Sequence, residues 1–249
     1  MTTTLGDWLA AEPFSLAMSS GFFSFYAHTG MLDALVTAGL RPRLISGSSA
    51  GAMVGAAYAC GLEMPQLADR LNALTRDDFW DPKLGAGLLA GDKFDRILRD
   101  LMPVTDASGC RVPIRISVYE IKTRQTRVIA SGDLPPAVRA SCCVPAMFHP
   151  VVIDGRAYWD GGIKDRPGLA GIPVGDRTLF HHIAAPAPWS RKGPPLVERP
   201  NMVSLVLDDL PRSNPFQLAK GRQALIAARE ATKRALDRVI ARDVVRLAA

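Results

Sequence analysis

The stretch ISGSSAGAMVG, residues 45–55, is the segment that most clearly indicates the fold, and it contains Ser49. Small side chains fill positions 46–52 between two apolar runs. Residues 47–51 fit G-x-S-x-G, a pattern in which a serine at a sharp turn between a strand and a helix exposes its hydroxyl group. Two interpretations are open at this point: Ser49 is a nucleophile, or it is one of several small residues in a tight turn.

The flanking residues favour the nucleophile. The segment Arg43-Leu44-Ile45 predicts a strand, and residues 50–60, rich in Ala and Met and followed by Gly61, predict a helix. A strand, a turn and a helix are the context in which the motif exposes its serine. Gly47 and Gly51 are then required, because larger side chains would collide where the strand and the helix cross.

The rest of the chain alternates between strand and helix patterns. We expect strands at 14–18, 112–119, 126–130, 151–153, 157–159, 179–183 and 202–207. We expect helices at 28–38, 65–74, 95–101, 136–141 and 215–247. The turn Asp154-Gly155 joins two of the strands in a hairpin. This order predicts an α/β layered sheet with an antiparallel patch at the hairpin.

Length and composition favour one domain. The 249 residues are 48% hydrophobic and 22% charged, which is typical of a globular protein. The sequence contains no Pro/Gly/Ser-rich linker and no repeat of fixed period, so we expect a single domain over 1–249. The loop at 79–89 is apolar, and either packs on the body of the protein or covers a site and docks on lipid.

The cysteines and the N-terminal residues indicate a cellular compartment. Cys60, Cys110 and the adjacent Cys142 and Cys143 match neither a disulfide framework nor a zinc site, and suit buried thiols in a reducing compartment. The first residues lack the pattern of a signal peptide, and no apolar run is long enough to span a bilayer. We therefore expect a soluble, cytoplasmic protein, without a metal or an organic cofactor.

The net charge of +6 is concentrated at the C-terminus, where residues 212–249 carry nine basic and three acidic side chains. One interpretation is a helix at 215–247 that packs on the sheet and exposes a basic face. The other is contact between this helix and an anionic membrane surface. The first is favoured because amphipathic helices normally pack on the core. Nucleic acid is not an expected partner, since few aromatic residues accompany the charge.

A serine nucleophile needs a base and hydrogen-bond donors for the oxyanion. Asp160, in YWDGGIKDRPG, ends an apolar strand, and Gly161 and Gly162 after it allow the backbone to fold tightly. His181 or His182 stays open as an alternative base, because Ser–Asp–His is the usual chain order in α/β-hydrolases.

Three segments, taken together, resemble the patatin-like phospholipase family over about residues 14–170. They are FSLAMSSGFFSFYAHTGML (14–32), ISGSSAGAMVGAAYACG (45–61) and LPPAVRASCCVPAMFHPVVIDGRAYWDGG (134–162). The resemblance implies a three-layer α/β/α sandwich with a mainly parallel central sheet. It also implies a Ser–Asp dyad, in which Ser49 attacks the carbonyl carbon of an ester and Asp160 accepts the serine proton.

The resemblance places an oxyanion loop at 20–25, where the family has the form G-G-x-R-G. Gly21 is retained, whereas Ser24 stands at the arginine position and Phe25 at the closing glycine position. The backbone N–H groups of Gly21, Phe22 and Phe23 are expected to bind the oxyanion.

A further donor is expected from the backbone N–H group of Ala50.

The altered loop leaves two functions open. One is an acyl hydrolase that cleaves esters of phospholipids or other lipids. The other is a non-catalytic protein of the same fold that binds a lipid or a partner.

Overall fold

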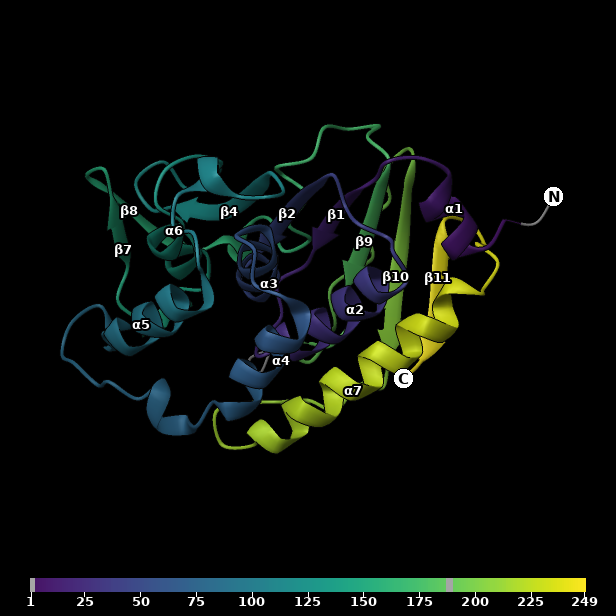
Figure 1. The fold of residues 1–249 in the computed structure, drawn as a ribbon. Helices are drawn as coiled ribbons and strands as arrows, with labels where there is room; N and C mark the ends of the chain where they lie inside the picture. Colours follow the sequence, from purple (N-terminus) through teal and green to yellow (C-terminus); the bar gives the residue numbers. More distant parts are fainter. Residues whose placement is uncertain (1–2, 187–189) are drawn as a thin grey trace.

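The computed structural model describes residues 3–186 and 190–249, and its centre is a sheet of nine strands (Figure 1). Along the sheet the order is β11 (Val244–Ala248), β10 (Met202–Asp208), β9 (Thr178–His182), β1 (Ser15–Met18), β2 (Leu44–Ser48), β4 (Ile114–Glu120), β8 (Arg156–Asp160) and β7 (Val151–Ile153). The ninth strand, β5 (Gln125–Ile129), also pairs with β4.

The sheet is mainly parallel, as predicted. Every pairing from β11 to β4 along this order is parallel, and antiparallel pairing is confined to β4 with β5, β4 with β8, and β7 with β8. The predicted hairpin joins β7 to β8, and its turn residues Asp154 and Gly155 both have positive φ, 49° and 73°. Such a turn matches the twist of paired strands, which explains the antiparallel patch.

The two faces of the sheet are covered unequally. Leu16 and Met18 of β1 belong to the larger core cluster, to which α2 (Phe25–Thr37), α3 (Ala50–Ala59) and α7 (Leu218–Leu236) contribute. Ala17 points to the opposite face, because side chains alternate along a strand, and joins a smaller cluster. The other members of this smaller cluster are Phe180 of β9, Met202 of β10, and Leu169 and Ile172 from the chain that follows β8. The α/β class is confirmed, with a thick helical layer and a thin second layer.

The remaining helices are α1 (Leu5–Ala11), α4 (Met64–Ala73), α5 (Asp92–Leu101) and α6 (Leu134–Ser141). Most predicted elements begin and end within three residues of their observed bounds. The helix α1 was not predicted, nor was a small sheet of β3 (Gly87–Leu89) and β6 (Ala146–Phe148). Within the described residues, no helix combines the length and the apolar character needed to cross a membrane.

The predicted helix at 215–247 is wrong in its last third. Helix α7 ends at Leu236, and the chain returns as β11 parallel to β10. The reversal contains Arg242 and Asp243, both with positive φ, 49° and 58°. Glycine usually occupies such positions, and no glycine marks this turn in the sequence. The apolar residues of the segment, which fit a helical stripe, therefore belong partly to a strand.

Helix α7 packs along α2, as Figure 1 shows. A Cβ atom at Gly30 of α2 would overlap the carbonyl oxygen of Leu225, so the two backbones approach closely. Part of the basic face is neutralised within the protein: Arg229 pairs with Asp33 at 2.9 Å. The packing interpretation of this helix is thus confirmed, and contact with a membrane stays a prediction.

Candidate active site

Ser49 occupies the sharp turn between β2 and α3 that the sequence motif predicts. Its backbone angles are φ 51° and ψ −118°, a strained conformation for a residue with a side chain. The backbone N–H of Ser49 donates to the hydroxyl of Ser141 (2.8 Å), which donates in turn to the carbonyl oxygen of Ser117 (2.7 Å). The turn is therefore tied to α6 and to β4 by hydrogen bonds.

Gly47 and Gly51 are required at this turn for the expected reason. A Cβ atom at Gly47 would lie 2.6 Å from the backbone nitrogen of Ala52, at the start of α3. A Cβ atom at Gly51 would overlap the backbone carbonyl of Met18 in β1. Both obstacles are backbone atoms, which cannot move aside as a flexible side chain can.

Asp160 lies at the end of β8, and its carboxylate accepts a hydrogen bond from the backbone N–H of Gly162 at 2.7 Å. The two glycines after it allow close approaches. A Cβ atom at Gly161 would overlap the carbonyl oxygen of Ser117, and one at Gly162 would lie 2.8 Å from Cβ of Ser20. The tight turn thus brings the predicted oxyanion loop beside Asp160.

Ser49 and Asp160 are 111 positions apart in the sequence, but in the folded chain both line the same cavity. Burial raises the pKa of Asp160 to about 6. Three influences oppose this rise: a hydrogen bond from the Ser49 side chain, the Gly162 N–H and the positive charge of Arg166. A carboxylate with this pKa is a stronger base than an exposed aspartate and is still ionised at neutral pH.

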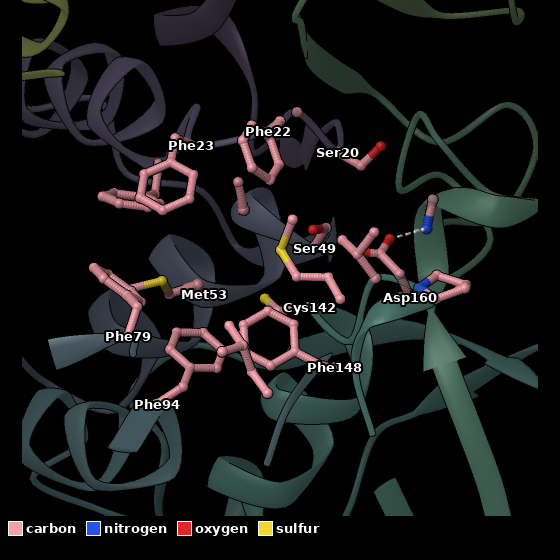
Figure 2. A pocket seen from close by; sticks show the side chains of 18 of the residues that line it. Ser20, Phe22, Phe23, Ser49, Met53, Phe79, Phe94, Cys142, Phe148 and Asp160 are labelled. Carbon is pink, nitrogen blue, oxygen red and sulfur yellow. Dashed lines mark hydrogen bonds between the residues drawn. The ribbon is translucent and has the colours of Figure 1, made fainter. Parts of the chain in front are cut away.

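A cavity of about 780 Å³ opens over these two residues (Figure 2). Phe23, Phe79 and Phe94 lie on one side of Ser49 in this view, and Asp160 lies on the other. Ring centroids are 5.4 Å apart from Phe23 to Phe79, 6.2 Å from Phe79 to Phe94 and 6.1 Å from Phe94 to Phe148. The cavity therefore has an aromatic side and a polar side, with Ser49 between them.

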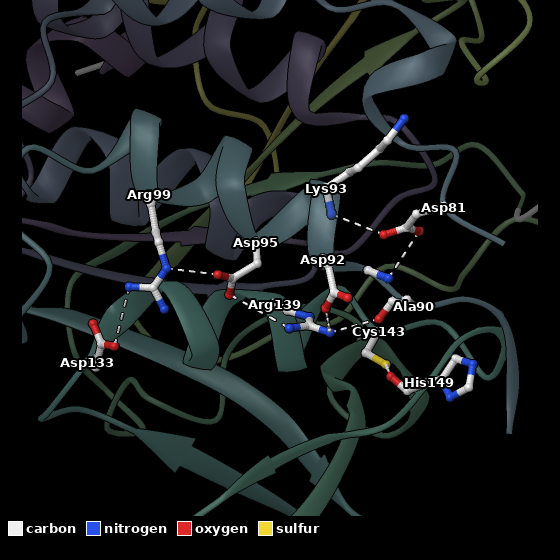
Figure 3. A network of polar contacts seen from close by, with 11 residues as sticks. Asp81, Ala90, Asp92, Lys93, Asp95, Arg99, Asp133, Arg139, Cys143 and His149 are labelled. Atoms are coloured by element: carbon white, nitrogen blue, oxygen red, sulfur yellow. Dashed lines mark hydrogen bonds and ion pairs between the residues drawn. The ribbon is translucent and has the colours of Figure 1, made fainter. Parts of the chain in front are cut away.

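A polar network supports the wall that carries Phe94 (Figure 3). Arg139 of α6 donates to the carbonyl oxygen of Ala90 at 2.8 Å and lies 3.5 Å from Asp92 of α5. Asp81 accepts hydrogen bonds from the backbone N–H groups of Gly91 (3.1 Å) and Lys93 (3.0 Å). These contacts fix the apolar loop at 79–89 against α5 and α6. Phe79, Leu88 and Leu89 of this loop line the cavity.

Asp160 is the only carboxylate among the described residues that line the cavity, and no histidine is among them. His181 lies with its Nδ1 2.8 Å from Nδ1 of His28, whose Nε2 lies 2.8 Å from the carbonyl oxygen of Ser19. Because a carbonyl only accepts, His28 carries its proton on Nε2 and accepts a hydrogen bond from His181. The alternative bases, His181 and His182, are thus absent from the part of the site that the structure describes.

All four residues predicted to supply oxyanion donors line the cavity together with Ser49: Gly21, Phe22, Phe23 and Ala50. Phe23 has a positive φ of 55°, although it is not glycine. Its ring packs against Phe22 at 5.0 Å and against Phe25 at 5.3 Å between centroids. Aromatic packing therefore holds the loop in a conformation for which a glycine is the usual residue.

Comparison with known proteins agrees with this geometry. The model of the family described as patatin-like phospholipase matches residues 16–170. The chain belongs to the patatin-like phospholipase family. Its fold is also similar to that of VipD from Legionella pneumophila, with a TM-score of 0.53 and 15% identity over 91% of this chain and 67% of VipD. That similarity concerns the fold alone.

Curated relatives of this patatin-like chain are longer than it is. An uncharacterized NTE family protein of Mycobacterium tuberculosis is 30% identical over 216 residues, which are 85% of this chain and 59% of the relative. An omega-hydroxyceramide transacylase of Mus musculus is 30% identical over 166 residues, 60% of this chain and 27% of the relative. The chain thus spans about three-fifths or less of these relatives.

Sequence reasoning missed several residues of this patatin-like site. Arg166 lines the cavity and follows Asp160 by six positions, within the segment that contains the Asp-Gly-Gly motif. Its basic side chain was the available signal. The thiol of Cys142 also lines the cavity; burial raises its pKa well above the ordinary value, and a hydrogen bond with Ser49 opposes this. Ser141, which fixes the Ser49 turn, carries no signal of its own in the sequence.

Proposed function

We propose that the protein is a serine acyl hydrolase that cleaves carboxylic esters of lipids, with Ser49 as the nucleophile and Asp160 as the base. The observation that carries the proposal is the placement of Ser49 and the buried carboxylate of Asp160 in one cavity, where burial raises the pKa of that carboxylate to about 6. The family model supports it, as does the mouse relative, whose name describes acyl transfer on a ceramide.

In the proposed reaction Asp160 takes the proton of Ser49 as the serine oxygen attacks the carbonyl carbon of the ester. The carbonyl oxygen becomes an oxyanion, which the backbone N–H groups at 21–23 and the N–H of Ala50 stabilise. The leaving alcohol departs with the proton that Asp160 holds. Water then attacks the acyl-enzyme while Asp160 takes its proton. The bond between Ser49 Oγ and the acyl group breaks, Asp160 returns the proton to Oγ, and the fatty acid leaves.

The aromatic side of the cavity suits an acyl chain. Phe79, Phe94 and Phe148 present apolar surface beside Ser49, and each buried methylene group contributes roughly 0.8 kcal/mol to binding. We therefore propose that the acyl chain of the substrate lies along these rings, with its carbonyl carbon at Ser49.

The remaining sequence predictions stay proposals. We propose that residues 1–249 act as a single domain and that the protein works in the cytoplasm. Contact of the basic residues at 212–249 with an anionic membrane also stays a prediction. Some of these residues are paired internally, Lys233 with Glu230 at 2.8 Å and Arg246 with Asp208 at 3.0 Å, which reduces the charge available to lipid.

The altered oxyanion loop, with Phe23 at positive φ, supports the second candidate: a non-catalytic protein that binds a lipid or a partner on the same fold. The test is hydrolysis of p-nitrophenyl esters with acyl chains of several lengths. We expect Ser49→Ala to lose at least about 10³-fold in kcat/KM while the melting temperature stays within a few degrees.

Ser48→Ala is the matched control. Its hydroxyl is buried and has no hydrogen-bond partner among the described residues, so its removal leaves activity intact. Full turnover by Ser49→Ala contradicts the proposed nucleophile. A folded wild-type protein that binds fatty acid but hydrolyses none of the esters supports the non-catalytic candidate.

A further inference from the structure

The polar side of the cavity holds a cation that forms no ion pair within the described residues. Arg166 is the only basic residue among the described residues that line the cavity. None of the ion pairs within the described part of the chain includes it. Its charge lowers the pKa of Asp160, but less than the hydrogen bonds from Ser49 and Gly162 do. Arg166 is therefore not simply the counterion of Asp160.

The guanidinium group of Arg166 has N–H donors that make no hydrogen bond within the described residues. Its Nη2 donates to the carbonyl oxygen of Ala185 at 3.0 Å, whereas its Nε is buried and has no partner among the described residues. A guanidinium group offers five N–H donors, and a charge that is partly buried is costly unless an anion or hydrogen bonds compensate it. The burial of Arg166 lowers its own pKa, which reflects this cost.

The backbone holds Arg166 beside the reacting groups. Its carbonyl oxygen accepts a hydrogen bond from the backbone N–H of Ser20 at 2.7 Å, at the start of the oxyanion loop. Arg166 therefore belongs to the same wall as Asp160 and Ser20, where this loop begins. The rings of Phe23, Phe79 and Phe94 lie on the other side of Ser49 (Figure 2).

The chemistry fixes which part of an ester meets this wall. Asp160 must deliver the proton to the leaving oxygen, so the alcohol part of the substrate has to lie on the side of Asp160. The acyl chain then extends to the aromatic side. A negatively charged group on the alcohol part comes close to Arg166, whose planar fork of donors matches a phosphate or carboxylate group.

We propose that Arg166 forms a binding site for an anionic group on the alcohol part of the substrate, so that the enzyme prefers acyl esters with a net negative head group. The inference rests on the proposed function and deepens it by naming the substrate class. A phosphate monoester next to the acylated glycerol is the chemistry that fits best, since it can accept several N–H bonds at once.

The test compares two esters with the same acyl chain, 1-octanoyl-glycerol 3-phosphate and 1-octanoyl-glycerol. We expect wild-type kcat/KM to be at least about tenfold higher for the phosphate ester, mainly through KM. In Arg166→Gln the ratio of the two kcat/KM values is expected to fall to about one. Arg166→Lys is expected to keep part of the preference, because lysine retains the positive charge but not the planar set of N–H donors. The control is Lys164→Gln, which removes an exposed charge from the same segment and is expected to keep the ratio.

A binding measurement separates this inference from the proposed function. Octyl phosphate is expected to raise the melting temperature of wild type and of Ser49→Ala, but not that of Arg166→Gln. Octyl glucoside, which is uncharged, is expected to change the melting temperature of all three proteins equally. Equal kcat/KM for both esters in wild type, or an equal loss for both in Arg166→Gln, overturns the anion site. Selective stabilisation by octyl phosphate without any ester hydrolysis overturns the hydrolase and leaves the anion site standing.

Discussion

The turn around Ser49, residues 47–51, and the predicted oxyanion loop, residues 20–25, line the same cavity, but different forces hold them. At the turn, glycines stand where backbone meets backbone: a Cβ atom at Gly51 would overlap the Met18 carbonyl. In the loop, the rings of Phe22, Phe23 and Phe25 pack on one another. The difference teaches that contacts between backbones leave no freedom to vary a sequence, whereas a loop held by side chains can be rebuilt from other side chains.

The largest expected difference between the two regions is in the loss of stability when one methyl group is added to each. Gly51→Ala is expected to destabilise the protein by about 3 kcal/mol or more, because its Cβ meets backbone atoms. In Gly21→Ala the new Cβ meets Oγ and Cβ of Ser24 and Cγ2 of Ile183. The hydroxyl can rotate away and the loop can shift at Ser24, so we expect about 1 kcal/mol. Urea unfolding measures both, and equal losses contradict the distinction.

Asp160→Asn tests a third contribution, the buried charge on the polar side of the cavity. The folded-state pKa of about 6 lies above the ordinary value of 3.8, so ionisation of Asp160 destabilises the fold as pH rises through about 6. The amide removes this cost. We expect a gain of about 3 kcal/mol at pH 8 that vanishes below about pH 4, measured by urea unfolding. A gain that is independent of pH contradicts the assignment.

The smallest expected effect concerns the loop. Phe23→Gly relieves the positive φ but removes the contacts of the ring with Phe22, Phe25 and Phe79. If packing holds the loop, the net result is a loss of about 1 kcal/mol in stability and about tenfold in esterase activity. Melting curves and ester hydrolysis test this, and a variant that is more stable and equally active indicates that the ring is dispensable.

Much of the fold was predictable because its strands are apolar and its turns carry glycine. The turn at Ser49, the hairpin at Asp154-Gly155 and the tight bend after Asp160 all show this signal. The end of α7 does not. Arg242 and Asp243 take positive φ without glycine, and the valines that follow fit a helix stripe as well as a strand. Only pairing with β10 distinguishes the two, and that contact is remote in sequence.

The positions of the candidate residues were predictable where a motif contains the residue, whereas their catalytic roles stay a prediction. Ser49 and Asp160 stand in recognisable patterns, and the folded chain brings them together. The walls of the cavity were not predictable, because Phe94 and Phe148 come from separate elements that pack only in three dimensions. Arg166 and Ser141 were missed for the same reason: their role depends on what lies beside them, which spacing along the chain does not reveal.

The most direct test of the Ser49–Asp160 pair is the rate of covalent labelling by a fluorophosphonate as a function of pH. We predict that the label maps to Ser49, that the rate rises through an apparent pKa of about 6, and that Asp160→Asn lowers it at least about 100-fold. A label on another residue, or a rate that Asp160→Asn leaves unchanged, contradicts the account.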